Sequence, residues 1–419
     1  MRNEFNSKGR VPSRLDEIKR RGLRGDKDFA RSTAYKSNQS MGNVDSFMKK
    51  YKAKEIRLLE AIDKMLEEPI SKETIDKILV EKRTISRTMN RKPINNKSSN
   101  SIQRTPTSTG SDYRIMNRTF SQQIIRPPLV SAKNWITVNA DTQEIVYGHR
   151  IYQEKEVASV TKIMTCLITL DFVSKYNVDI DKTHYLVSRK AGQVGGTTAN
   201  LKKDDYVCIR DLLYGLMLPS GNDAAQTLAE NIITHRYILD RHKNCNPNEL
   251  SYDEDVPADK NLEAEFYYLM NKKGRELGLS NTNYNSSHGL MNEDNFSCCF
   301  DQAKLSIEAI KHPMIQEIVK TTSFTALIER NNRDCELIWS NTNKLLEKRG
   351  YKGIKTGVTK RAGGCLSTNY STKGLNLVTI VLGCKDTESR FIDSDAINSW
   401  VVQNYGEIME IPAEDRYTR

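Results

Sequence analysis

Predicted β-strands lie at both ends of the larger, C-terminal part of this chain, and predicted helices occupy the sequence between them. Near the start of that part, NWITVNADTQEIVYG (134–148) has two β-branched or aromatic stretches around a polar turn, which predicts a hairpin. Near its end, three apolar stretches follow one another with turn residues between them: KGIKTGV (352–358), GGCLSTNYS (363–371) and LNLVTIVLG (375–383). This order predicts an α+β domain in which one mainly antiparallel sheet is flanked by helices.

The segments between and after these strands carry apolar residues at helical intervals. Pro219 and Gly221 interrupt one long apolar run and mark a turn between two helices, while Gly278 closes a later helix. Helices are predicted at about 159–176, 210–218, 223–233, 262–278 and 389–406.

Charge and composition change abruptly near residue 130. Residues 1–130 hold 29 Lys and Arg against 15 Asp and Glu, a net charge of +14, whereas the rest of the chain is near neutral. We expect a disordered basic tail (1–43), a helical segment with the pattern of a hairpin (44–89), a linker (90–130) and one compact domain (131–408) with a polar insertion (235–261). A basic arm on a near-neutral body predicts an acidic partner or surface for the arm.

The eight cysteines all lie in the second part of the chain, mostly within apolar runs. This predicts buried free thiols and a reducing compartment, with disulfides as the alternative. No C-x-x-C pair occurs, and we expect neither a metal nor another cofactor. The N-terminus lacks the apolar stretch of a signal peptide, and no segment approaches ~20 consecutive apolar residues. No transmembrane segment is therefore expected, and the location is left open, with the cytoplasm as the default.

Ser159 and Lys162 stand three residues apart in VASVTKIMTCL (157–167), an otherwise apolar run. At helical spacing their side chains share a face. A serine hydroxyl is a weak nucleophile that needs a base, and a lysine can serve when burial and a nearby cation lower its pKa. In the alternative interpretation, the methylene chain of Lys162 is buried and its ammonium group reaches water, with no chemical role. Because Ser46 and Lys49 repeat the spacing without evident purpose, this motif alone is weak.

Two further motifs follow in the chain, and their order supports the chemical interpretation. An S-G-N motif (220–222) falls on the predicted turn between helices, and a K-T-G motif (355–357), which occurs once, falls on a predicted strand. Lys355 would supply a second positive charge and a fixed cation for a substrate carboxylate. Ser220 can relay a proton to a departing amine, and Asn222 can hold a substrate amide.

With these motifs in this order, residues 132–405 resemble the D-alanyl-D-alanine carboxypeptidases, the low-molecular-mass penicillin-binding proteins of the S11 serine peptidase family. DLLYGLMLPSGNDAAQTLAE, NTNKLL, GIKTGVTKRAGGCL and VTIVLG extend the likeness beyond the motifs. The resemblance implies a β-lactamase/transpeptidase-like fold and a serine-type carboxypeptidase that works through an acyl-enzyme. It also implies peptides that end in D-Ala-D-Ala, with a free terminal carboxylate, as substrates and β-lactams as inhibitors.

The resemblance also assigns roles to single residues. It implies that Ser159 is the acylated nucleophile, that Lys162 is its general base and that Ser220 belongs to the proton network. The implied substrate-binding residues are Asn222, Lys355, Thr356 and Gly357. The implied oxyanion hole consists of the backbone N–H groups of Ser159 and Val358.

Several features depart from the family pattern. The family is normally exported, yet we expect no signal peptide here, and we expect neither the usual C-terminal second domain nor the membrane anchor after Tyr405. The basic arm and the 235–261 insertion are also outside the pattern, which leaves substrate and location open. His288 in SSHGL matches a family loop and is interpreted as structural, and Arg390 as a surface or capping residue rather than a carboxylate contact.

Two alternative functions stay open at this point. A β-lactamase would need fast deacylation, and no equivalent of the extra glutamate of class A enzymes can be placed in the sequence. A binding or scaffold protein that lost turnover, with the basic arm as its working part, is the other alternative. The intact set of Ser159, Lys162, Ser220, Asn222 and Lys355 argues against it.

Overall fold

A computed structural model describes residues 125–242, 247–248, 261–290, 292–372 and 374–419. All of these belong to one compact unit, Ser111–Arg419. The predicted tail (1–43) and helical segment (44–89) lie outside the described residues, as does the linker up to residue 124. The acidic partner expected for the arm therefore stays a prediction.

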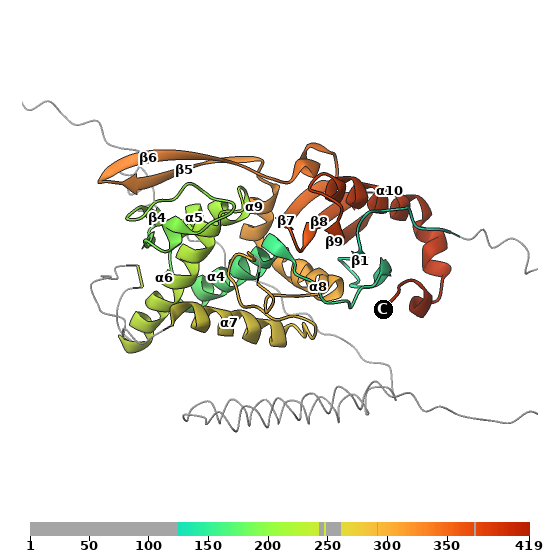
Figure 1. Cartoon of the computed structure of the whole chain (residues 1–419), viewed down its shortest axis with the longest axis horizontal. Coiled ribbons are helices and arrows are strands. Elements are labelled where there is room, and N and C mark those ends of the chain that lie inside the picture. The colour runs from blue at the N-terminus through green and yellow to red at the C-terminus, as the bar shows by residue number, and fades with distance from the viewer. Residues whose placement is uncertain (1–124, 243–246, 249–260, 291, 373) are drawn as a thin grey trace, which may run out of the picture. The chain divides into compact units, whose positions relative to one another are not determined.

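A five-stranded antiparallel sheet joins the two ends of the domain, with the strand order β2-β1-β9-β8-β7 (Figure 1). Its strands are β1 (Asn134–Asn139), β2 (Ile145–His149), β7 (Tyr351–Thr359), β8 (Gly363–Thr372) and β9 (Leu375–Cys384). The predicted hairpin and the three predicted C-terminal strands are confirmed. Strand β1 pairs with β9 along its whole length, from Asn134 opposite Leu382 to Asn139 opposite Leu377.

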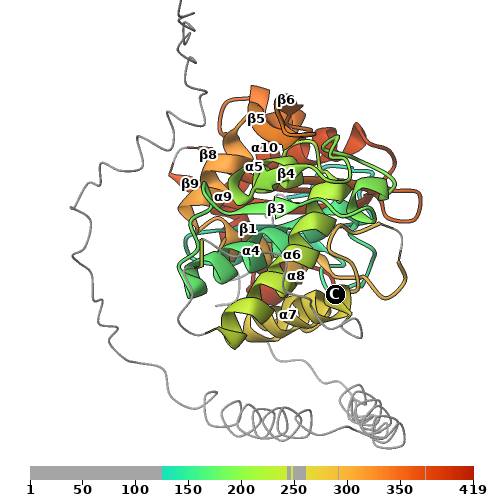
Figure 2. The ribbon, with the colours of Figure 1, turned by 90° about the vertical axis from the view of Figure 1, so that its left-hand side faces the viewer.

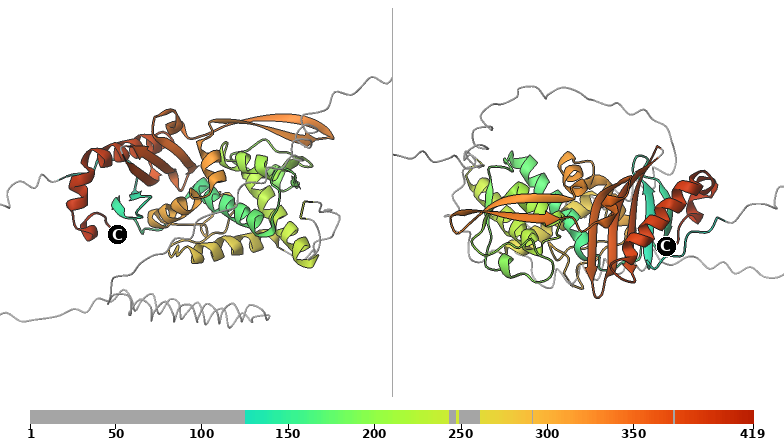
Figure 3. Two further views of the ribbon diagram at one scale, coloured as in Figure 1. Left: turned by 180° about the vertical axis from the view of Figure 1, so that it is seen from behind. Right: turned by 90° about the horizontal axis from the view of Figure 1, so that it is seen from above.

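Both faces of this sheet are buried, because side chains alternate between two apolar clusters. Ile136, Val138 and Ile380 face the cluster that contains most of the helices, whereas Trp135 and Val381 face the cluster under helix α10. Helix α10 (Ser389–Glu410) lies along one face of the sheet, and the other helices lie on the opposite side (Figure 3). The predicted last helix is thereby confirmed.

Within the described ranges, four of the six remaining helices lie at predicted ranges, and no range was predicted for the last two. They are α4 (Lys162–Tyr176), α5 (Ile209–Met217), α6 (Asn222–Arg241), α7 (Leu262–Glu276), α8 (Cys299–Ala309) and α9 (Pro313–Lys320). Helix α6 continues through 235–241, residues that the sequence analysis assigned to the irregular insertion. That assignment was wrong for this stretch, because His235 and Ile238 are buried in the helical layer. Apart from 242, 247, 248 and 261, the rest of the insertion lies outside the described residues.

A second, four-stranded sheet was missed, since a single sheet was expected. It has the order β3-β4-β5-β6 and consists of β3 (His184–Leu186), β4 (Tyr206–Cys208), β5 (Ser323–Arg330) and β6 (Arg333–Ser340). Strands β5 and β6 form a long hairpin closed by Asn331 and Asn332, both with positive φ (Figure 1). Figure 2 shows the same two strands nearly end-on, at the top of the view. Its sequence pattern is weak because polar and charged residues occupy most outward positions.

Two expectations about the whole chain can be compared with this structure. Seven of the eight cysteines lie among the described residues, and all seven are free thiols, buried except for Cys335. No described helix has the length and apolar character needed to cross a membrane.

Candidate active site

Ser159 sits in a single turn of 3-10 helix, η3 (Ala158–Thr161), directly before α4. The preceding residue, Ala158, has a φ of 49°, in the left-handed region that residues with a Cβ rarely adopt. Gly289 packs on this turn so closely that a Cβ there would lie 2.0 Å from the Ala158 carbonyl oxygen. Tight backbone packing therefore holds the strained turn that presents the Ser159 hydroxyl.

Lys162, the first residue of α4, is fully buried and does not reach the solvent. Its Nζ donates to Ser159 Oγ (3.0 Å), to Asn222 Oδ1 (2.6 Å) and to the His288 carbonyl oxygen (2.9 Å). Burial lowers the pKa of Lys162 well below its usual value, the positive charge of Lys355 lowers it further, and Asp223 opposes the shift. The snorkelling interpretation is therefore wrong, since the amine ends inside the protein.

The S-G-N motif forms the turn between α5 and α6, as predicted. Asn222 is the first residue of α6, and its Nδ2 donates to the Gly195 carbonyl oxygen at 2.7 Å. This bond orients the amide so that Oδ1 faces Lys162. Ser220 adopts a φ of 64°, and its Oγ is buried with no hydrogen-bond partner among the described residues. An unpartnered buried hydroxyl is unusual and remains available to a bound group.

Strand β7 carries the K-T-G motif at the edge of the five-stranded sheet. Lys355 is buried and donates to the carbonyl oxygen of Thr356 at 3.0 Å; burial and the charge of Arg390 lower its pKa to about 7. Thr356 Oγ1 shares a hydrogen bond of 2.7 Å with the hydroxyl of Thr342. A Cβ on Gly357 would lie 3.0 Å from the Ser159 nitrogen, so glycine permits the approach of β7 to η3.

The two backbone groups expected to form the oxyanion hole lie on neighbouring segments. Ser159 belongs to η3, and Val358 follows Gly357 on β7, with a side chain that is 45% exposed. The structure thus brings together the segments of all three motifs.

Arg390 differs from the sequence interpretation, whereas the contacts of His288 fit the structural role expected for it. Arg390 was interpreted as a surface or capping residue, yet it is only 8% exposed and donates to the Gly357 carbonyl oxygen at 2.8 Å. His288 contributes its backbone carbonyl to Lys162, while its Nδ1 accepts the Leu290 N–H at 3.1 Å. Burial and the charge of Lys162 lower the His288 pKa to about 3, so the ring is neutral. Neither contact has a local sequence signal, because each joins segments far apart in the chain.

Comparisons with known proteins identify the family to which the chain is similar. The family model for D-alanyl-D-alanine carboxypeptidase matches residues 121–235 and 261–386, which together exceed half of the chain. The gap between these stretches falls where the sequence analysis predicted the insertion. Within the described ranges, no group of three or more His, Cys, Asp or Glu side chains could hold a metal ion.

Two curated relatives illustrate the match. The D-alanyl-D-alanine carboxypeptidase of Streptomyces sp. strain K15 is 30% identical over 291 residues, which are 67% of this chain and 89% of the relative. The D-alanyl-D-alanine carboxypeptidase DacF of Bacillus subtilis is 29% identical over 264 residues, or 62% of this chain. This chain spans 59% of the length of DacF. Both relatives are named as carboxypeptidases, which gives no support to the β-lactamase and scaffold alternatives.

Among solved structures, the crystal structure of the Streptomyces K15 DD-transpeptidase is similar, with a TM-score of 0.57 and 26% identity. The likeness covers 67% of this chain and all of that chain. The expected transpeptidase-like fold is therefore confirmed. Since the family model matches more than half of its length and the three motifs meet around Ser159, this chain belongs to the D-alanyl-D-alanine carboxypeptidase family of serine peptidases.

Proposed function

We propose that this protein hydrolyses the terminal peptide bond of peptides ending in D-Ala-D-Ala, through an acyl-enzyme at Ser159. One observation carries the proposal: a fully buried lysine amine lies 3.0 Å from the Ser159 hydroxyl. Burial and the charge of Lys355 both disfavour the protonated amine. A neutral amine at that distance is a suitable general base for the hydroxyl.

In the acylation step, Lys162 Nζ takes the hydroxyl proton while Ser159 Oγ bonds to the carbonyl carbon of the last peptide bond. The backbone N–H groups of Ser159 and Val358 stabilise the negative oxygen that develops. When the C–N bond breaks, the departing amine of the terminal D-alanine receives a proton from Lys162 through the Ser220 hydroxyl. The buried and otherwise unpartnered state of that hydroxyl supports its use as a relay.

In the deacylation step, a water molecule gives a proton to Lys162 while its oxygen bonds to the ester carbon. The bond from that carbon to Ser159 Oγ then breaks, and Ser159 Oγ takes the proton from Lys162. The shortened peptide then departs. Substrate position is set by the terminal carboxylate, for which Lys355 offers a cation and Thr356 a hydroxyl. The Asn222 amide, fixed by Gly195 and Lys162, is the contact for the substrate backbone.

The test is incubation of the full-length protein with penicillin G, followed by intact-mass measurement and peptide mapping. We expect one adduct of the mass of penicillin, located on Ser159, and none in Ser159→Ala. Ser46→Ala is the matched control, because Ser46 precedes a lysine at the same spacing, and it should react like the wild type. Release of D-alanine from an N-acylated peptide ending in D-Ala-D-Ala is measured in parallel. No adduct and no D-alanine would refute the proposal, and an adduct hydrolysed as fast as it forms would favour a β-lactamase.

A further inference from the structure

We infer that the β5–β6 hairpin sets the position of the Asn222 amide, with Arg330 and Trp339 as positioning residues that act through the loop 195–205. The inference rests on the proposed function in one respect, the role of Asn222 and Lys162 in acylation. Its physical basis is a continuous set of hydrogen bonds in three layers. The first two join the S-G-N turn and the neighbouring Asp223 to the loop, and the third joins the loop to the hairpin.

The first layer joins the turn to the start of the loop. The Asn222 side chain donates to the Gly195 carbonyl oxygen (2.7 Å), and its backbone N–H donates to the Thr197 carbonyl oxygen (2.8 Å). The Thr197 hydroxyl donates to the carbonyl oxygen of Ser220 at 2.6 Å. With Nδ2 held by Gly195, only Oδ1 can face Lys162. The loop therefore decides which end of the amide the lysine meets.

The second layer is the carboxylate of Asp223, the residue after Asn222. It accepts the N–H groups of Ala199 (2.9 Å) and Leu201 (3.1 Å) and the hydroxyl of Thr198. Asp223 is buried, so these donors replace the water that its charge would otherwise bind. If the loop moves, this carboxylate loses its partners, and both Asn222 and the charge next to Lys162 are disturbed.

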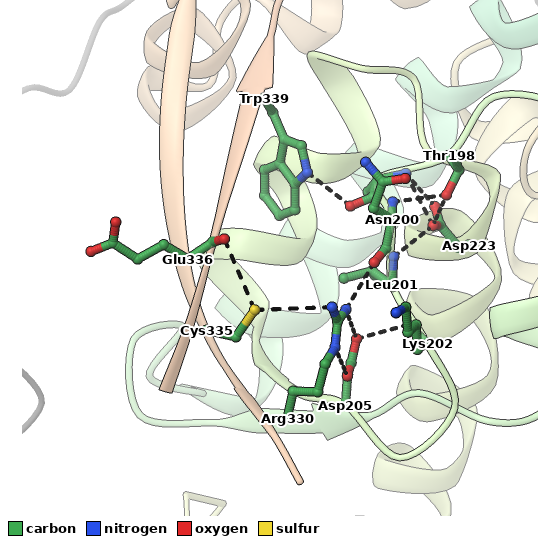
Figure 4. Close-up of polar contacts among 11 residues, drawn as sticks. Thr198, Asn200, Leu201, Lys202, Asp205, Asp223, Arg330, Cys335, Glu336 and Trp339 are labelled. Atoms are coloured by element: carbon green, nitrogen blue, oxygen red, sulfur yellow. Dashed lines mark hydrogen bonds and ion pairs between the residues drawn. The ribbon is translucent and has the colours of Figure 1, made fainter. Parts of the chain in front are cut away.

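The third layer fixes the loop to the hairpin, as Figure 4 shows. Arg330 on β5 donates through Nε and Nη2 to the two oxygens of Asp205 (2.7 and 2.6 Å), and Nη2 also donates to the Asn200 carbonyl oxygen (2.9 Å). Trp339 on β6 donates through Nε1 to the Ala199 carbonyl oxygen at 2.9 Å. Asp205 is fully buried and Trp339 nearly so. A buried carboxylate that lost its arginine would have to reach water, and the loop would have to open for it to do so.

The predicted consequence concerns the protonation of Lys162. The charged or titratable groups around its amine are Lys355 on β7, Asp223 on α6 and His288 between α7 and α8. Burial is the largest cause of its lowered pKa, and an open loop would admit water. The lysine would then keep its proton to higher pH. In a plot of acylation rate against pH, the acid limb would therefore move to higher pH.

The experiment compares Arg330→Met with Arg333→Met in the full chain. Arg333 is a matched control because it is the register partner of Arg330, lies at the exposed start of β6 and carries the same charge. The rate of acylation by penicillin is measured as a function of pH, together with the melting temperature. We expect Arg330→Met to slow acylation about 10-fold or more, since a misplacement of ~1 Å can cost on the order of 100-fold. Its acid limb should move to higher pH, and Arg333→Met should match the wild type.

A purely structural role would lower the melting temperature of Arg330→Met and leave its acylation rate and pH profile unchanged, which would overturn the inference. If Arg330→Met does not fold, Trp339→Phe replaces it, because phenylalanine keeps an aromatic ring in the core but cannot donate to Ala199. Its expected slowing is smaller and in the same direction, and an unchanged profile is again a refutation.

Hydrogen exchange separates this inference from the proposed function. Arg330→Met should speed exchange in the peptide that contains the Asn222 N–H, which is bonded to Thr197, and Arg333→Met should not. A wild type that never acylates would refute the proposed function, while the exchange result would still decide whether the hairpin holds the turn.

Discussion

Replacing Lys355 by methionine should make the protein more stable, and the gain should shrink as the pH rises. Methionine is close in size and suits a buried site, whereas the lysine is 1% exposed and lies near the charge of Arg390. These two causes lower its pKa from 10.5 to about 7. The folded protein therefore binds fewer protons than the unfolded chain between these values, so the stability of the wild type rises with pH across that window.

The magnitude follows from the size of that difference. At about 1.4 kcal/mol for each pKa unit, the charged lysine costs on the order of 5 kcal/mol of folding free energy below pH 7. At about pH 9 the lysine is neutral in the folded protein but still protonated in the unfolded chain. Folding at that pH therefore costs only the free energy of deprotonation, on the order of 2 kcal/mol. The advantage of Lys355→Met should thus fall by about 3 kcal/mol between about pH 6 and about pH 9.

The assay is urea unfolding of both proteins at these two pH values, followed by tryptophan fluorescence. Lys352→Met is the control, because Lys352 stands on the same strand with a partly exposed side chain, and its effect should be similar at both pH values. Acylation by penicillin should be strongly reduced in Lys355→Met, because the substitution removes the cation proposed to bind the carboxylate while it stabilises the fold. A Lys355→Met protein that is less stable, or an advantage that does not change with pH, would refute the reasoning.

Three further predictions test the site. Lys162→Arg keeps a cation that cannot deprotonate at ordinary pH, so acylation measured by mass should fall on the order of 1000-fold; a rate near that of the wild type would mean that another group activates Ser159. The second-order rate of acylation should rise with pH as Lys162 loses its proton, and it should fall above about pH 7 as Lys355 loses its charge. With a substrate ester that has no carboxylate, the fall should vanish, because Lys355 then has no anion to bind. Gly357→Ala places a methyl group 3.0 Å from the Ser159 nitrogen, so acylation should slow about 10-fold or more with little unfolding, and an unaffected rate would show that β7 can shift at no cost.

A further prediction concerns the boundary of the domain. Residues 121–419 without the arm should unfold cooperatively and acylate at the wild-type rate, because the groups that lie beside Ser159 within the described ranges, such as Lys162 and Gly357, belong to this part of the chain. Ile125 and Val130 pack against the cluster under α10, so a cut at residue 131 should cost some stability. Unfolding on heating is monitored by circular dichroism. Loss of cooperative unfolding in 121–419 would show that residues 44–89 contribute to the core.

Local sequence patterns were sufficient for most of the secondary structure. The hairpin at 134–148, the three C-terminal strands and the helices around the S-G-N motif are predicted by apolar periodicity and by turn residues such as Pro219. Periodicity works here because each of these elements buries one side or more against the core. The β5–β6 hairpin was missed for the opposite reason, since few of its side chains are buried and its outward positions are polar.

The motifs predicted which residues meet, but the contacts that give them their chemistry depend on the tertiary structure. The spacing of Ser159 and Lys162 is visible in the sequence, yet the two other acceptors of the lysine come from residues 60 and 126 positions away. The burial of Arg390 against Gly357 joins segments 33 residues apart and is likewise absent from any local pattern. A pKa depends on the water and charge around a group, and those are fixed only when distant segments close over it. The sequence alone therefore predicted which side chains meet around Ser159, whereas the packing of the chain decided their burial and orientation.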